Sequence, residues 1–508
     1  MSDEPLGPTP VTTDRDLTAQ EAASERSGLG RQAARGAVLT ISAQLVKILL
    51  QVAGVVVLAR LLTPGDYGLV AMVTAIVGVA EIFRDFGLSA AAVQAKNLSR
   101  AQRDNLFWIN TAAGAVLTAL VFLGAPLIAM FYGHPELIPL THVIAFVFLV
   151  NGMTTQYRAD LNRRLKFSRI AVIDIAAPLL SLVVAIIAAL SGLGYWSLVI
   201  QQLVMAGILL AGAAVFARWL PGRPRRRESM GNLMTFGWHL VGSQFLGYLA
   251  NNVDSLTIGS RFGATPLGLY NRAFQLLMTP LGQLRAPTTT VALPVLARLR
   301  NDLDGSNRYV QRGQLALGLT MVAGLGVIVG AAEPVTSIFL GAQWLSVEPI
   351  LRLLAIAGMF QTLAYVGYWV YLAHGLTKQL LQYTVITVTI KVTCILVGSH
   401  WGLIGVAWGY AIAPALAWPL SFWWLSRSST INVKGLFIGA GRVLLITAVI
   451  ALGSYGACTL TADLGRWVQL SAALVASVAC YCLALLVPPL RRDILGVVQI
   501  GRRGMKNR

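Results

Sequence analysis

Charged residues are scarce in this sequence. Only 12% of the 508 residues are Asp, Glu, Lys or Arg, whereas 56% are hydrophobic. A soluble domain contains about 25% charged residues. Apolar stretches long enough to cross a hydrocarbon core of about 30 Å recur along almost the whole chain, which leaves no room for a soluble catalytic domain. The sequence therefore predicts an all-α polytopic membrane protein.

Cysteines and acidic residues are also few. The four cysteines all lie within hydrophobic stretches, which disfavours a disulfide framework or a metal cluster. The chain has 21 acidic residues against 40 Lys and Arg, a formal net charge of +19. A nucleic-acid partner could explain such a charge in a soluble protein. Here the basic residues lie in short loops, where membrane topology explains them, so we expect no nucleic-acid partner.

Fourteen membrane spans are expected from the apolar stretches. Basic residues cluster after the even-numbered spans, and the opposite loops carry almost none beyond Arg261 and Arg466. The positive-inside rule then places both termini in the cytoplasm. The expected spans are 34–60, 66–95, 104–131, 137–158, 168–191, 195–219, 232–262, 266–297, 310–332, 347–373, 378–398, 401–426, 435–460 and 467–489.

Large outward loops are missing from this arrangement. The outward loops are a few residues long, and none holds paired carboxylates or a nucleophile with its base. The segment Gly133-His134-Pro135-Glu136 is best explained as a turn. We therefore do not expect an enzyme.

An internal repeat joins the two halves of the chain. Pro126–Gly133 resembles Pro334–Gly341, and Arg60 and Arg84 align with Arg261 and Arg285. This pattern predicts two six-helix lobes of the same orientation, related by a pseudo-two-fold axis along the membrane normal. The expected division is a disordered cytoplasmic tail (1–33), an N-terminal lobe (34–219, spans 1–6), a basic cytoplasmic linker (220–231), a C-terminal lobe (232–427, spans 7–12), spans 13 and 14 (428–490) and a basic cytoplasmic tail (491–508).

Polar residues occur on single faces of several spans. In the first span Gln44, Lys47 and Gln51 share one helical face, and Arg272, Gln275 and Thr279 share one in the eighth. A charge deep in a bilayer costs several kcal/mol unless it faces a partner or a wet cavity. We therefore expect these faces to turn inward, toward the junction between the lobes.

Three groups of candidate site residues follow. The deep cations are Lys47, Arg84, Arg272, Arg285 and Lys391. The expected polar lining is Gln44, Gln51, Asn251, Gln275, Thr279 and Tyr365. The acids Glu81, Asp85 and Asp254 are candidates for coupling to H⁺ or Na⁺, and we expect no other cofactor and no metal site.

Two interpretations of these charges stay open. They can form ion pairs that hold neighbouring helices together, since Glu81 and Asp85 flank Arg84 at helical spacing. Alternatively they line a cavity, and the excess of cations over acids would then attract anions. Arginine suits phosphate because its fork donates two parallel hydrogen bonds, and amides and hydroxyls suit sugars. The tyrosines are interpreted mostly as packing or interface residues.

Three short motifs carry a resemblance to a known family. They are Leu62-Thr63-Pro64-Gly65-Asp66-Tyr67-Gly68, Phe83-Arg84-Asp85-Phe86-Gly87-Leu88-Ser89 and Leu161-Asn162-Arg163-Arg164-Leu165-Lys166-Phe167. In this order they resemble the polysaccharide-transporter branch of the multidrug/oligosaccharidyl-lipid/polysaccharide exporter superfamily. The likeness covers spans 1 to 12 and is greatest to Wzx-type flippases of exopolysaccharide clusters, such as the colanic acid and succinoglycan translocases.

The resemblance implies a function. Such proteins move an undecaprenyl-pyrophosphate-linked oligosaccharide across the bacterial inner membrane by alternating access around a cationic cavity. The lipid bilayer and the polysaccharide polymerase or export machinery are the partners implied. In the related lipid II flippase, cations on the first, second and eighth helices line the cavity, and Lys47, Arg84, Arg272 and Arg285 lie on those helices here. A cation-coupled multidrug antiporter of the same superfamily is the alternative, with Asp85 and Asp254 as its candidate acids.

Overall fold

The structure is a computed structural model that describes residues 42, 44–85, 99–224, 247–248, 250–429 and 431–506. The predicted tail 1–33 and most of the predicted linker lie outside this range. The described residues contain helices and connecting turns but no strand, which confirms the predicted all-α class.

The helices follow one another with short connections. After the first helix, Gln44–Leu61, and apart from the helical residues 250–262, they are α2 (Pro64–Asp85), α4 (Arg100–Tyr132), α5 (Leu137–Arg163), α6 (Phe167–Leu190), α7 (Trp196–Ala217), α9 (Ala264–Arg298), α10 (Leu303–Leu317), α11 (Ala323–Gly330), α12 (Ala332–Phe339), α13 (Glu348–Ala373), α14 (Thr377–Gly398), α15 (Gly402–Ser428), α16 (Val433–Leu460), α17 (Arg466–Ala484) and α18 (Pro488–Lys506). A π-helical turn (Gly318–Val322) joins α10 to α11, and a short 3-10 helix, η2 (Ala342–Val347), precedes α13.

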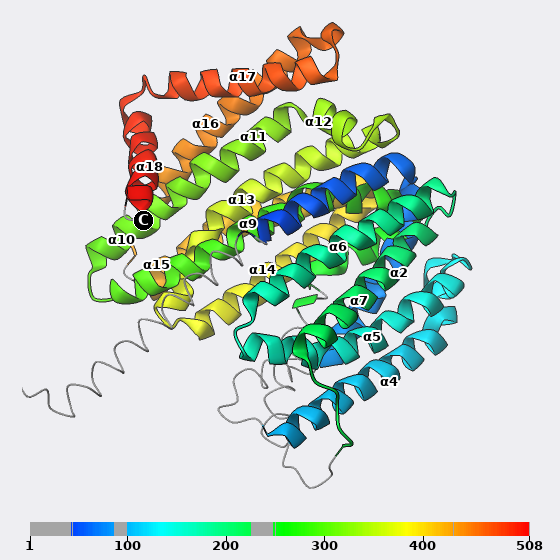
Figure 1. The fold of residues 1–508 in the computed structure, drawn as a ribbon. Helices are drawn as coiled ribbons and strands as arrows, with labels where there is room; N and C mark the ends of the chain where they lie inside the picture. Colours follow the sequence, from blue (N-terminus) through cyan, green and yellow to red (C-terminus); the bar gives the residue numbers. More distant parts are fainter. Residues whose placement is uncertain are drawn as a thin grey trace, which may run out of the picture.

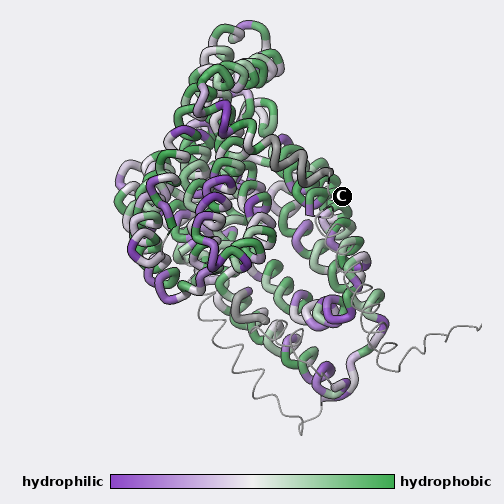
Figure 2. The backbone as a smooth tube through the Cα atoms, turned by 90° about the vertical axis from the view of Figure 1, so that its left-hand side faces the viewer, coloured by the Kyte–Doolittle hydropathy of each residue, from purple (hydrophilic) through white to green (hydrophobic). Residues whose placement is uncertain are grey.

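Ten helical stretches among the described residues are long and apolar enough to cross a membrane. One of these stretches, Thr377–Ser428, contains both α14 and α15. Figure 2 shows hydrophobic residues over most helices and hydrophilic residues in short stretches. The protein is therefore a multi-pass membrane protein, whereas the count of fourteen spans and the pseudo-two-fold axis stay predictions.

The helices form two packed groups. The N-terminal bundle contains the first helix, α2 and α4–α7, and the C-terminal bundle contains residues 250–262, α9–α15 and the added helices α16 and α17. In Figure 1, α4 and α5 lie at one flank, α16 to α18 at the opposite flank, and α9 and α13 between them. The bundles meet chiefly where α2 packs against α9.

Two glycines allow this contact to be close. A Cβ atom added to Gly68 would lie 1.8 Å from the carbonyl oxygen of Ala264, and one added to Gly268 would lie 1.8 Å from that of Pro64. Each glycine thus packs on the first residue of the opposite helix. Small residues at a helix crossing let two backbones approach in this way.

The same end of the molecule contains reciprocal helix caps. The last carbonyl groups of a helix have no partner within that helix. Near the C-terminus of the first helix, Ala59 O accepts bonds from Gln343 Nε2 and Trp344 Nε1, both 2.7 Å. In return, Arg60 Nη2 donates to Ile338 O near the C-terminus of α12, at 2.6 Å. We call residues 59–68, 263–268 and 338–344 the closed end.

Several charged residues near the helix ends pair with one another. Arg158 contacts Asp174 through two hydrogen bonds of 2.6 and 3.1 Å. The other described pairs include Arg352 with Glu348, Arg466 with Glu333, and Arg442 with Asp493. These paired charges near the helix ends therefore do not belong to a central site. The candidate site is formed by the cations that lie deeper in the helices.

Candidate functional site

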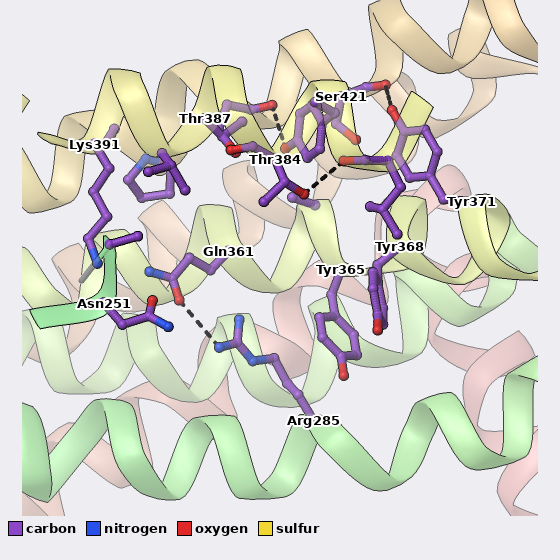
Figure 3. A pocket seen from close by; sticks show the side chains of 18 of the residues that line it. Asn251, Arg285, Gln361, Tyr365, Tyr368, Tyr371, Thr384, Thr387, Lys391 and Ser421 are labelled. Atoms are coloured by element: carbon purple, nitrogen blue, oxygen red, sulfur yellow. Dashed lines mark hydrogen bonds between the residues drawn. The ribbon is translucent and has the colours of Figure 1, made fainter. Parts of the chain in front are cut away.

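A cavity of about 650 Å³ lies within the C-terminal bundle. Its walls come from α9, α13, α14 and α15, with Asn251 contributed by the helical residues 250–262. In Figure 3, Lys391 and Asn251 lie toward one end, Tyr368 and Tyr371 toward the other, and Arg285 between them. We call this space the C-terminal cavity.

Two cations enter the C-terminal cavity, and no acidic residue is among the described residues that line it. Arg285 Nη2 donates to Gln361 Oε1 at 3.3 Å, and its Cζ lies 5.5 Å from the ring centre of Tyr365. Lys391 Nζ lies 5.0 Å from the ring centre of Tyr410. The hydrogen-bond and ring partners of both cations are neutral, and the buried carboxylate of Asp254 interacts electrostatically with Lys391 from outside the cavity wall.

Tyrosines form much of the same wall. Five of them line the cavity: Tyr365, Tyr368, Tyr371, Tyr383 and Tyr410. The rings of Tyr371 and Tyr383 stack at 5.8 Å, and those of Tyr365 and Tyr368 lie 5.9 Å apart. Hydroxyl groups of Thr384, Thr387 and Ser421 complete this side. The wall thus offers flat apolar surfaces next to many hydrogen-bonding groups.

Two adjoining hollows of about 210 and 370 Å³ lie against the N-terminal bundle. They share Gln201, Arg272 and Gln275, and the smaller one is also lined by Lys47 and Gln51. We call the two hollows together the N-terminal cavity. It also lacks an acidic residue among the described residues that line it.

Arg272 is the most buried of the described cavity cations. It is 8% exposed, and its Cζ lies 3.5 Å from the ring centre of Tyr67. Its Nε atom is buried, as is that of Arg285, and neither has a hydrogen-bond partner in the described part of the chain. An arginine in this state has donors to offer to an anion.

A chain of glutamines joins the first helix to α9. Gln44 Nε2 donates to Gln283 Oε1 at 3.2 Å, and Gln283 Nε2 donates to Gln51 Oε1 at 3.0 Å. These bonds bring polar side chains of the first helix and of α9 into contact. Gln44 takes part in this bridge rather than in lining a cavity.

The remaining predicted residues have different positions. Thr279 lines neither cavity. Glu81 accepts a bond from Asn151 Nδ2 on α5 at 3.3 Å. Asp254 is 2% exposed and is held by Tyr270 Oη at 2.8 Å and by the backbone N of Ser255 at 2.9 Å. The side chains of Arg84 and Asp85 lie outside the described part.

Several lining residues were not among the predicted ones. They include Ser181, Gln201, Gln202, Tyr371, Tyr383, Tyr410 and Ser421. Gln201 and Gln202 form a pair of amides in the apolar α7, a signal equal to that of Gln44 and Gln51. The tyrosines could not be separated by sequence from those that only pack.

The chemistry of both cavities favours a polar anion. Excess positive charge between low-dielectric walls concentrates anions. The described residues contain no group of three or more His, Cys, Asp or Glu that could hold a metal ion. Among the described residues that line the two cavities there is no carboxylate of the kind that a cationic solute would need.

Comparison with known sequences gives consistent relatives. Residues 57–349 match the sequence model of a family described as polysaccharide biosynthesis protein. The teichuronic acid biosynthesis protein TuaB of Bacillus subtilis is 26% identical over 411 residues, which are 79% of this chain and 84% of that protein. The lipopolysaccharide biosynthesis protein WzxC of Escherichia coli is 25% identical over 374 residues, 72% of this chain and 75% of that protein.

Solved structures share the fold. The lipid II flippase MurJ in an inward closed conformation superposes with a TM-score of 0.67 at 14% identity, covering 90% of this chain and all of that one (100%). An inward-facing multidrug resistance MATE transporter of the MOP superfamily gives 0.58 at 15% identity, covering 79% and 99%. The resemblance based on the three motifs is thus confirmed. Because the family match spans more than half of the chain, this multi-pass membrane protein belongs to the polysaccharide biosynthesis protein family.

Proposed function

We propose that this protein is a flippase for undecaprenyl-pyrophosphate-linked oligosaccharides. It moves them from the cytoplasmic to the periplasmic leaflet of a bacterial inner membrane, for exopolysaccharide or lipopolysaccharide synthesis. The two cavities receive the polar part of the substrate while the lipid tail stays in the bilayer. A polysaccharide polymerase or export complex would take up the product.

One observation supports this proposal above all. Arg272, Arg285 and Lys391 project into cavities and rest on tyrosine rings, and no described acid forms a direct ion pair with them, although the buried Asp254 interacts electrostatically with Lys391. A buried cation costs several kcal/mol, so it is retained where it serves a function. Anionic groups of the substrate, its diphosphate among them, supply the missing negative charge, and the neighbouring amides and hydroxyls suit sugars. Names of the relatives, which refer to polysaccharide synthesis, point to the same substrate class.

The closed end belongs on the periplasmic side in this proposal. The loops at that end are poor in basic residues, whereas basic residues cluster in the opposite loops. Alternating access would then require α2 and α9 to separate at Gly68 and Gly268, so that the cavities open outward. Glu81, Asp85 and Asp254 stay candidates for coupling this motion to H⁺ or Na⁺.

The alternative of a multidrug antiporter has less support. A cationic drug needs an accessible carboxylate, but Asp254 is buried and its carboxylate is occupied by Tyr270 and the Ser255 backbone. The cavities present cations instead. Altered drug sensitivity on overexpression, with normal polysaccharide, would favour the antiporter.

Depletion in the host tests the proposed function. We expect undecaprenyl-pyrophosphate-linked oligosaccharide to accumulate, measured by mass spectrometry of membrane lipids, while surface polysaccharide is lost. The accumulated species would also identify the repeat unit. Normal polysaccharide without accumulation would refute the proposal.

Charge reversal at Arg285 tests the cavity. Arg285→Glu places a carboxylate where the substrate anion would bind, so polysaccharide export should fall at least about tenfold, since charged hydrogen bonds contribute about 1.5–3 kcal/mol. Export is measured by complementation of the depleted host, at equal protein levels in the membrane. Arg308→Glu, at an exposed position on α10, is the matched control and should export normally. Normal export by the Arg285 variant would contradict the cavity role.

A further inference from the structure

The two cationic cavities lie far apart on one helix. Arg272 and Arg285 both belong to α9 and are thirteen residues apart, which is about 20 Å along the axis. The residues that line the C-terminal cavity and those that line the N-terminal cavity do not overlap. Since the two arginines line different cavities, we assign a single diphosphate group to one of them only.

The walls of the two cavities also differ in chemistry. Around Lys47 and Arg272 the remaining wall consists mainly of amides and aliphatic side chains such as Leu182, Leu198 and Met205, with one tyrosine and the hydroxyls of a serine and a threonine among them. Such a wall suits a diphosphate that is attached to an isoprenoid chain. The C-terminal cavity has tyrosines and hydroxyls in these places, and it is the larger of the two.

Tyrosines and hydroxyls together are suited to sugars. A sugar ring has apolar C–H faces and a rim of hydroxyl groups, so it packs flat on an aromatic ring and hydrogen-bonds at its edge. Tyr368 is 41% exposed and presents its ring to the cavity, with Thr384 and Thr387 on the opposing helix α14. A neutral sugar, however, carries no negative charge that could pair with the two cations beside this wall.

We propose that the C-terminal cavity binds a sugar that carries a carboxylate, so that the glycan of the substrate is acidic. Arg285 and Lys391 bind the carboxylate, and Tyr365 and Tyr368 pack against the sugar rings. This proposal rests on the proposed function, in which the N-terminal cavity takes the diphosphate. It adds a second anionic group, the sugar carboxylate, to the substrate and assigns its binding to the C-terminal cavity.

The positions of the two cations fit this role. Gln361 contacts both Arg285 and Tyr410, at 3.3 Å each, and Tyr410 lies under Lys391. Gln361 and Tyr410 therefore connect the two cations along one wall of the cavity before any ligand arrives. In the proposed complex the carboxylate binds between the arginine fork and the lysine.

Binding of three defined lipids to the purified full chain tests the proposal. The probes are undecaprenyl diphosphate, undecaprenyl diphosphate with a neutral disaccharide, and the same lipid with a terminal glucuronate. Affinity is measured in detergent by native mass spectrometry. We expect the glucuronate lipid to bind at least about tenfold more tightly than the neutral one, as a charged hydrogen-bond pair would give.

Three variants separate the two cavities. Lys391→Gln should remove the preference for glucuronate and leave undecaprenyl diphosphate binding unchanged. Tyr368→Ala should weaken both glycan lipids but not undecaprenyl diphosphate, and its half-exposed position makes loss of folding a minor concern. Arg272→Gln should weaken all three lipids alike. Unfolding temperatures confirm that each variant is folded, and Lys391→Arg should retain the preference.

The outcomes are distinguishable. Equal affinity of the wild type for the neutral and the glucuronate lipid would overturn the acidic-sugar proposal and leave the flippase function standing. An equal loss of undecaprenyl diphosphate binding in Lys391→Gln would also overturn it, since the diphosphate would then occupy the C-terminal cavity. Failure of the wild type to bind any of the three lipids would remove the proposed function itself.

Discussion

Arg272, Arg285 and Lys391 share an unusual environment for membrane cations, because each lies against a tyrosine ring. A cation over an aromatic ring is stabilised by about 0.5–2 kcal/mol. This is far less than the attraction between the two charges of a buried ion pair. The ring therefore stabilises the side chain without neutralising it. Sequence located the cations because they interrupt apolar stretches, but it could not find ring partners such as Tyr67, which lies far away in the chain.

Single glycines at the closed end give a residue-scale prediction. Gly68→Ala would push a methyl group into Ala264 O, so the α2–α9 contact must widen. We expect a loss of about 1–3 kcal/mol, as for other overpacked sites, seen as a lower unfolding temperature in detergent. Gly282→Ala is the control on α9, because an added Cβ there meets nothing within 4 Å. Equal unfolding temperatures for the two variants would argue against the close crossing.

At the scale of elements, the hydrophobic runs predicted where helices lie in the sequence better than they predicted which helices contact each other. The expected span 104–131 corresponds to α4 (Arg100–Tyr132), which begins earlier because Ser99 and Gln102 form a capping box. The expected span 266–297 corresponds to α9, despite three prolines within that helix. The apolar pattern predicted the positions of these helices in the sequence, but it contains no information on which helices cross closely. The α2–α9 contact was therefore not predictable.

The reciprocal caps give an element-scale prediction. Ala59 O receives bonds from both Gln343 and Trp344, and Gln343 also donates to Leu62 O at 3.2 Å. Trp344→Phe should therefore cost little alone, because Gln343 still satisfies Ala59. The double variant with Gln343→Leu leaves both carbonyls unpaired and should cost about 1–3 kcal/mol for each lost partner. Unfolding temperatures of the single and double variants measure this, and purely additive effects would contradict shared capping.

At the scale of the whole molecule, the sequence predicted a polar interior but not a division into two cavities. The charges on the first helix, α9 and α14 predicted an inward-facing cationic region, and the structure places Lys47, Arg272, Arg285 and Lys391 in cavities. The division into two cavities depends on how α9 passes between the bundles, which no local pattern encodes. Tyr371, Tyr383 and Tyr410 were missed for the same reason, since a tyrosine has the same local signature in a core and in a cavity.

A disulfide across the closed end tests alternating access. A Cβ atom on Gly65 would lie 3.6 Å from Thr265 Oγ1, so side chains at these two positions come into contact across the closed end. In a chain with its four native cysteines replaced, Gly65→Cys with Thr265→Cys should stop lipid flipping in proteoliposomes on oxidation and recover on reduction. Each single cysteine variant is the control and should be insensitive to oxidant. Undiminished flipping by the cross-linked protein would show that the closed end does not open.

The caps at the closed end also bear on the electrical insulation of the membrane. The large side chains there, Leu62, Tyr67 and Trp344, are buried, and the helix carbonyls are covered by side chains of the opposite bundle. Water and small ions would therefore meet mainly apolar side chains at this helix crossing. In the proposed flippase cycle, this sealed end would keep the passage of a bulky hydrophilic cargo from opening a continuous aqueous pore, and the membrane potential would be retained.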